Sequence, residues 1–174
     1  MADFKNICEW VMRQEDSTLS GKIVDLGDGQ GSTRFGIAQK SHPEVTSWFY
    51  STTMPAALAL PIAEQVYRET YWNRFQGDAI VSDQVASCLL SFSINDGTSR
   101  EVKMLQECLN VPIDGVVGPM TLLHLNAYAP EVLAPALRAA QADFYRALVV
   151  SNPTDTRFLQ GWLRRAARVY PSLV

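Results

Sequence analysis

Carboxylic acids and a hydroxyl group flank a glycine-rich stretch near the N-terminus. Glu15 closes a segment with helical periodicity, and the polar segment after it contains Asp25, Asp28 and Thr33. A carboxylic acid at the end of a core-packed helix, shielded by an aromatic neighbour such as Trp10, can stay protonated near neutral pH. A carboxylate on the opposite loop can then act as base for a water between the two groups. These residues predict inverting glycosidase chemistry with Glu15 as the general acid, and Asp25 and Asp28 compete for the second role.

Other readings of the glycine-rich stretch fail on spacing. The segment from Gly27 to Thr33 lacks the lysine of a phosphate-binding loop, and a helical pattern rather than a strand precedes it. As a calcium loop starting at Asp25 it would need Glu at its twelfth position, which is Gly36. His42 and His124 have no partners at metal-ligand spacing. We therefore expect neither a metal site nor a cofactor.

Helices must position these residues. Apolar residues recur every three or four positions from Phe4 to Val11, which predicts a helix that ends near Glu15. The alternation at Ile23, Val24 and Leu26 predicts an irregular hairpin within a long loop. Capping residues and prolines predict further helices. One spans 55–71, the next runs from Ser82 or Asp83 to Phe92 and is stopped by Asn95-Asp96-Gly97, and a third runs from Thr98 or Ser99 to Leu109. Three more begin at Pro119, at Pro130 and at Asp155 or Thr156.

Composition limits the class of protein. The chain has 174 residues, 47% hydrophobic and 19% charged, with a net charge of −3, and this supports one good core. The C-terminal part is rich in arginine, including Arg164, Arg165 and Arg168, but the acidic majority elsewhere argues against nucleic acid as a partner.

The cysteines and the apolar segments indicate the cellular compartment in which the protein folds. Cys8 and Cys88 lie among apolar residues, which predicts small buried thiols and folding in a reducing cytosol. The first residues do not form a signal peptide, and the apolar run from Met54 to Ala63 is too short to span a bilayer. We expect synthesis in the bacterial cytoplasm and no stable membrane insertion.

The order of several motifs resembles glycoside hydrolase family 108. The matching features are Glu15, Gly-Ser-Thr33-Arg-Phe-Gly36-Ile37, Tyr71-Trp72, Ser93-Ile-Asn95-Asp-Gly97, and the series Leu105-Gln106, Asp114-Gly115, Gly118-Pro119 and Thr121-Leu122. The family pattern usually has two glycines after the glutamate, where this chain has Asp16-Ser17. The last series is similar to the peptidoglycan-binding module that accompanies the family.

The resemblance implies an N-acetylmuramidase of the endolysin or secretion-associated kind. Its fold would be mainly α, lysozyme-like, with a small irregular β-hairpin. Residues 1–97 would form the catalytic region, and residues 98–174 a helical peptidoglycan-binding-like region packed on it. The substrate would be the peptidoglycan glycan strand outside the cytosol, reached through a holin or exporter.

Site roles also follow from resemblance. Phage-type lysozymes are more distantly similar and have an aspartate about nine residues after the glutamate, which favours Asp25 over Asp28 as the base. Thr33 would orient the attacking water. Asp28 would then contact substrate or form a turn. The remaining residues implied to contact the sugar are Gly36, Tyr71, Trp72 and Asn95.

Two other functions remain open. A lytic transglycosylase needs a catalytic glutamate but no base, and it produces anhydro-muramic ends. A non-catalytic peptidoglycan-binding or secretion accessory protein would bind the wall without cleaving it.

Overall fold

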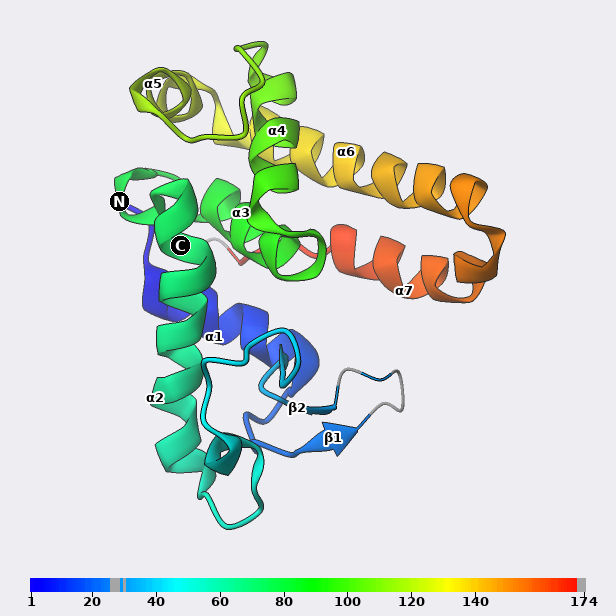
Figure 1. Ribbon diagram of the computed structural model, residues 1–174. Coiled ribbons are helices and arrows are strands. Elements are labelled where there is room, and N and C mark those ends of the chain that lie inside the picture. The colour runs from blue at the N-terminus through cyan, green and yellow to red at the C-terminus, as the bar shows by residue number, and fades with distance from the viewer. Residues whose placement is uncertain (26–28, 30, 172–174) are drawn as a thin grey trace. The chain divides into compact units, whose positions relative to one another are not determined.

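The computed structural model describes residues 1–25, 29 and 31–171. Helices dominate it, with one small antiparallel sheet (Figure 1). The prediction of a mainly α fold with a small irregular hairpin is confirmed. The helices are α1 Phe4–Glu15, α2 Ala56–Val66, α3 Asp83–Asp96, α4 Thr98–Leu109, α5 Pro119–Ala127, α6 Pro130–Ser151 and α7 Thr156–Ala166, and the strands are β1 Val24–Asp25, β2 Ser32–Arg34 and β3 Ile37–Ala38.

Contacts divide the chain into two compact units. One unit is Lys5–Thr70, and the other joins Met1–Phe4 to the chain from Tyr71 onward. Helix α3 belongs to the second unit because it packs on α4 and α6. A functional boundary after residue 97 therefore differs from this structural division, and it stays a prediction.

In the unit Lys5–Thr70, α1 ends at Glu15 as its periodicity predicts. The helix buries Ile7, Cys8, Val11 and Met12 on one face. The polar loop after it leads into β1, β2 and β3, which pair in that order. Val24 pairs with Thr33, and Arg34 pairs with Ile37. The hairpin expected near Val24 is present, and β3 adds a third strand.

A buried arginine organises the loops around this sheet. The side chain of Arg34 is only 3% exposed, and its guanidinium donates hydrogen bonds to three backbone carbonyls. The acceptors are Gly21 at 2.8 Å, Phe49 at 2.8 Å and Met54 at 2.9 Å. These bonds satisfy both the charge and carbonyl groups that irregular backbone leaves without partners. Arg34 therefore fixes the loops on both sides of the sheet.

The helix predicted over 55–71 changes character before its end. Pro55 is the N-cap of α2, which runs to Val66, and Tyr67–Tyr71 is a π-helical turn. The predicted helical span through Tyr71 is therefore confirmed, and its last five residues are π-helical in place of α-helical. Within this turn Tyr67 is buried and its hydroxyl donates a 2.9 Å hydrogen bond to the carbonyl of Phe35. The π-helical turn thus contains a side chain that is hydrogen-bonded to the loop between β2 and β3.

In the second unit, α3 and α4 follow each other almost without a loop. Ser82 caps α3 by accepting a bond from the Val85 amide at 3.3 Å, and Gly97 ends it with a φ of +85°. The prediction that Thr98 or Ser99 caps α4 is wrong, because Gly97 also takes the N-cap position and α4 starts at Thr98. The starts of α5 at Pro119, α6 at Pro130 and α7 at Thr156 agree with the prediction.

The connector between α4 and α5 is held by one buried side chain. Gln106 donates to the Asp114 carboxylate at 2.7 Å and to the Val116 carbonyl at 3.0 Å, and accepts from the Gly115 amide at 2.8 Å. Gly115 has a φ of +77°, which suits the turn predicted at Asp114-Gly115. The motif residues around Leu105-Gln106 and Asp114-Gly115 therefore shape a turn.

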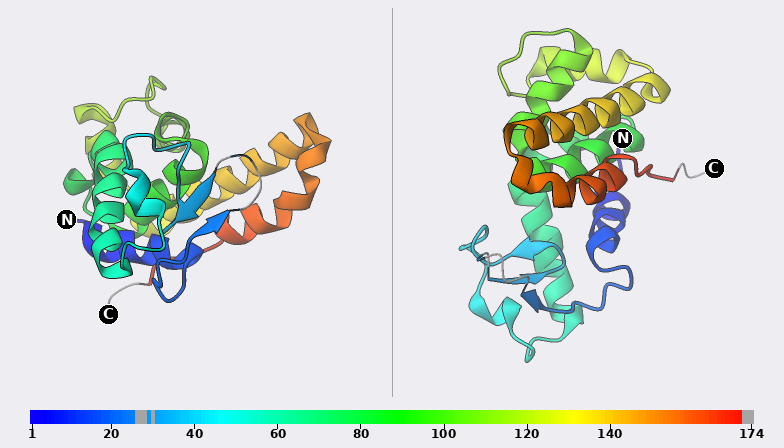
Figure 2. Two further views of the ribbon diagram at one scale, coloured as in Figure 1. Left: turned by 60° about the horizontal axis from the view of Figure 1, so that its bottom comes forward. Right: turned by 90° about the vertical axis from the view of Figure 1, so that its right-hand side faces the viewer.

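Helices α6 and α7 form an antiparallel hairpin, seen from three directions in Figures 1 and 2. Trp162 of α7 stacks on Tyr145 of α6, with ring centroids 5.2 Å apart and planes at 29°. No helix in the described part of the chain is both long and apolar enough to cross a membrane. Cys8 and Cys88 are free and buried, as predicted, and Cys108 is half-buried and also free.

Candidate active site

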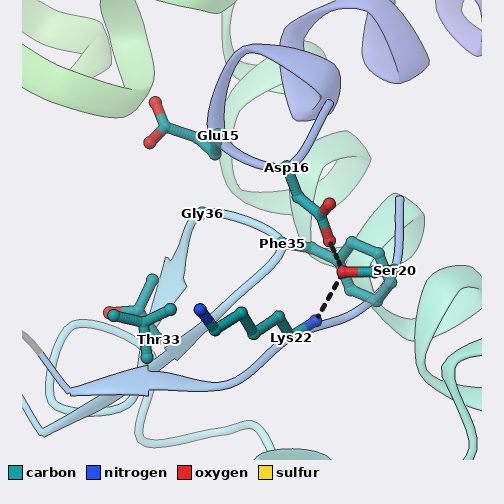
Figure 3. Close-up of a pocket in the computed structure, with 8 residues that line it drawn as sticks. Glu15, Asp16, Ser20, Lys22, Thr33, Phe35 and Gly36 are labelled. Atoms are coloured by element: carbon teal, nitrogen blue, oxygen red, sulfur yellow. Dashed lines mark hydrogen bonds between the residues drawn. The ribbon is translucent and has the colours of Figure 1, made fainter. Parts of the chain in front are cut away.

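A pocket of about 300 Å³ lies within the unit Lys5–Thr70 (Figure 3). It collects residues from the end of α1, the loop after it, and strands β1 and β2. Three of the residues predicted from the sequence line it together: Glu15, Thr33 and Gly36. The other residues that line it are Asp16, Ser20, Lys22, Val24 and Phe35.

Glu15 stands at the rim of this pocket as the last residue of α1. Its side chain is exposed. Figure 3 shows its carboxyl group extending away from the neighbouring Asp16. The aromatic residue of the lining is Phe35, in place of the Trp10 expected to shield Glu15. A carboxyl group in this position is accessible to a ligand, and the helix holds the backbone from which the side chain extends.

The turn at Gly36 lies directly against Glu15. Gly36 has a φ of +79°, and a Cβ built on it would lie 2.7 Å from the Tyr67 hydroxyl and 3.2 Å from Cγ of Glu15. No other residue type fits this close approach without displacing one of those side chains. The glycine of the Thr-x-x-Gly-Ile element thus sets the distance between the backbone of the turn and the candidate acid.

Thr33 and Asp25 lie on opposite faces of the β1–β2 hairpin. Thr33 and Val24 are cross-strand partners and both line the pocket. Asp25 pairs with Ser32, and its side chain is exposed. Because successive side chains of a strand point to opposite faces, Asp25 lies on the face opposite Val24 and Thr33. Asp28 lies outside the described residues.

Asp16 is a pocket residue that the sequence analysis did not identify. Its carboxylate accepts bonds from the Gly21 amide at 2.7 Å, the Ser20 hydroxyl at 3.0 Å and the Thr18 hydroxyl at 3.2 Å. Burial raises its pKa, but these hydrogen bonds outweigh burial and hold the pKa of Asp16 below its usual value. Asp16 is therefore an ionised group that shapes the loop after α1.

Lys22 is the second residue missed, and it is the cation among the residues that line this pocket. Figure 3 shows its side chain extended across the pocket wall toward Thr33. Lys22 precedes Val24 by two positions, so the two side chains share a face where the chain is extended. This spacing of two residues could have predicted from the sequence that Lys22 lies on the same face of the hairpin as Val24 and Thr33.

Tyr71, Trp72 and Asn95 belong to the other compact unit. The Trp72 side chain is fully buried, makes edge contacts with Phe4 and Phe75, and donates its indole N–H to Asp78 at 2.9 Å. Trp72 is thus a core residue. Tyr71 is half-buried and Asn95 is exposed, and a role for them in sugar binding stays a prediction.

Comparison with known families connects this pocket to a class of enzyme. Residues 9–97, which contain the whole pocket, match the model of the family described as Glycosyl hydrolase 108. The chain belongs to glycosyl hydrolase family 108. The resemblance inferred from the motifs is thereby confirmed, and family 108 membership implies a glycoside hydrolase.

The rest of this family 108 chain has its own match. Residues 100–167 match a family described as Predicted Peptidoglycan domain. The solved structure of SagA from Brucella abortus is similar over 95% of this chain and 90% of that one, with 28% identity and a TM-score of 0.74. No curated protein matches significantly. The chain therefore joins a glycosyl hydrolase 108 domain to a predicted peptidoglycan domain.

Proposed function

We propose that this family 108 protein hydrolyses the β-1,4 bond between N-acetylmuramic acid and N-acetylglucosamine in peptidoglycan. The observation that carries the proposal is the pocket in which Glu15, Thr33 and Gly36 meet. The pocket lies inside the glycosyl hydrolase domain, and a predicted peptidoglycan domain follows in the same chain.

Glu15 acts as the general acid in this proposal. Its carboxylic acid donates a proton to the glycosidic oxygen as the bond from that oxygen to the anomeric carbon breaks. A water attacks the anomeric carbon from the opposite side and gives its proton to a second carboxylate. Thr33, whose side chain is half-buried in the pocket lining, accepts or donates a hydrogen bond that orients this water.

We propose Asp25 as the base, with Asp28 as the alternative. Asp25 lies on the strand face opposite Thr33, so it can serve only if the short β1–β2 pairing rearranges when substrate binds. Comparing Asp25→Asn with Asp28→Asn identifies the carboxylate that the reaction needs. If neither change reduces hydrolysis, a mechanism without a base Asp is favoured.

Digestion of purified sacculi tests the reaction itself. Mass spectrometry of the products should show hydrated muramic acid ends for the wild type, and Glu15→Gln should reduce turnover 10²-fold or more. Glu9→Gln, on the same helix and paired with Arg13 at 2.8 Å, is the matched control and should remain active. Anhydro-muramic ends would instead identify a lytic transglycosylase. Wall binding without any cleavage would identify a non-catalytic binding protein.

A further inference from the structure

We propose that the groove between α4 and α6 binds the stem peptide of peptidoglycan. The inference rests on the proposed function for the identity of the polymer, and it adds a second site that recognises the peptide part of the wall. The groove lies entirely within the second compact unit.

Two adjoining hollows form this groove. One measures about 330 Å³ and the other about 460 Å³, and both are lined by Arg100 and Lys103. The first hollow also includes Asp96, Gly97 and Ser99, and the second includes Met104, Glu107, Ala140, Asp143, Phe144 and Ala147. The second hollow lies between α4 and α6, the first lies where α3 meets α4, and the side chains of Arg100 and Lys103 line both.

The second hollow has an apolar floor with room for a peptide backbone. Met104 is buried, Phe144 is half-buried, and the Arg100 guanidinium lies over the Phe144 ring at 4.7 Å. Ala140 and Ala147 are seven residues apart and therefore share a face of α6. Small side chains at these two positions allow close approach of a main chain.

The positive side chains of the groove are held in place. Arg100 donates to the Asp96 carbonyl at 3.2 Å as well as covering Phe144. The aliphatic part of Lys103 lies against the connector, because a Cβ at Gly115 would be 3.1 Å from Cε of Lys103. Both cations are thus partly ordered before a ligand arrives, which lowers the entropy cost of binding.

Carboxylates line the second hollow together with these cations. Glu107 is exposed, and Asp143 is paired at 2.7 Å with Arg146, which is itself exposed. Asp96, near Arg100, accepts hydrogen bonds from Tyr145 and Gln141, so its carboxylate is already engaged. Along α4 the groove therefore presents the cations Arg100 and Lys103 first and the carboxylate of Glu107 one turn after Lys103.

A stem peptide has the complementary charges and the right length. It carries carboxylates and the ammonium group of its diamino acid, and its γ-linked backbone is extended. Arg100 and Glu107 are seven residues apart on α4, a rise of about 10 Å, which three to four extended residues cover at about 3.3 Å each. A glycan would use an open aromatic face, and Arg100 covers the face of Phe144.

Calorimetry on the full chain tests the groove. The probe is the tetrapeptide L-Ala-γ-D-Glu-meso-diaminopimelyl-D-Ala at low salt. We expect Arg100→Glu with Lys103→Glu to weaken binding about tenfold or more, because charge reversal removes two attractions and adds two repulsions. Arg157→Glu with Arg164→Glu on α7 makes the same change in net charge on exposed residues and should leave binding unchanged. Thermal unfolding of both double variants verifies that they fold.

Three outcomes overturn the proposal: no binding of the tetrapeptide by the wild type, equal binding by the groove variant, or loss of chitooligosaccharide binding in parallel with peptide binding. The last outcome would make the groove a glycan site. A second substrate, glycan strands from which an amidase has removed the stem peptides, tests the proposed hydrolysis independently of peptide binding. The groove variant should cleave them as fast as the wild type does. A wild type that cleaves neither stripped strands nor sacculi would contradict the proposed hydrolysis, whereas the calorimetry would still decide the groove.

Discussion

The hydroxyl of Tyr67 donates a 2.9 Å hydrogen bond to the backbone carbonyl of Phe35, the residue before Gly36. This bond ties the π-helical turn after α2 to the turn that lies against Glu15. A residue distant in sequence from the pocket thereby fixes the position of its wall. Support of this kind decides how accurately a site is held.

Removing that hydroxyl should loosen the site. Tyr67→Phe leaves the Phe35 carbonyl without this buried partner, and we expect the free energy of unfolding to fall by about 1–3 kcal/mol. Urea denaturation measures the change, and sacculus digestion should show a lower kcat. Tyr128→Phe, at an exposed tyrosine, is the control. An unchanged midpoint for Tyr67→Phe would show that the bond contributes little.

Two glycines with the same backbone conformation give a matched pair. Gly36 and Gly29 have φ values of +79° and +81°, but a Cβ at Gly36 meets the Tyr67 hydroxyl at 2.7 Å, whereas a Cβ at Gly29 meets no atom of the described residues within 4 Å. Gly36→Ala should therefore reduce both stability and hydrolysis. Gly29→Ala should show only the cost of an unfavourable φ, about 1 kcal/mol. Equal losses in the two variants would mean that crowding against Tyr67 and Glu15 is unimportant.

Lys22 gives a prediction about substrate binding. As the cation on the pocket wall, it should attract acidic groups of the substrate without taking part in proton transfer. Lys22→Met should raise KM for sacculi several-fold, leave kcat nearly unchanged and weaken the dependence of KM on salt. Lys40→Met removes an exposed lysine from the same unit for comparison. A fall in kcat at constant KM would instead place Lys22 in the chemical step.

Glu101 predicts how stability changes with pH. It is fully buried on α4, and neither carboxyl oxygen has a hydrogen-bond partner among the described residues. Its pKa is raised to about 9, chiefly by burial and also by the nearby Asp96, while Arg100 acts in the opposite direction. The folded protein therefore retains a proton that the unfolded chain releases above its ordinary pKa near 4.5. This contribution to stability is complete at lower pH and is lost as the pH rises toward 9.

Glu101→Gln should remove this dependence. Between pH 5 and 9 the wild type should lose up to about 1.4 kcal/mol of unfolding free energy per pH unit from this group, and the variant should lose less. Urea denaturation at several pH values measures the two slopes. Lys103→Met, on the exposed side of α4, should keep the wild-type slope. Parallel slopes for wild type and Glu101→Gln would show that Glu101 is ionised in the folded state.

Local rules predicted the helices well and the site only partly. Pro119 and Pro130 start helices because their fixed φ suits a first turn, and Gly97 ends α3 because it adopts positive φ. The face of Asp25 was not predictable, because a strand of two residues shows too little alternation to read. The burial of Trp72 and the bond from Tyr67 depend on contacts between distant segments, and periodicity says nothing about them.

The bonds of Arg34 have a consequence for how the site opens. One guanidinium holds carbonyls at Gly21, Phe49 and Met54, so none of these segments can leave without exposing a buried charge that the others still surround. Local fraying at one segment thus removes a hydrogen-bond partner from the same buried charge that holds the other two. Amide hydrogens near them should exchange with solvent at a common rate in native-state exchange experiments, as a single cooperative unit of the fold.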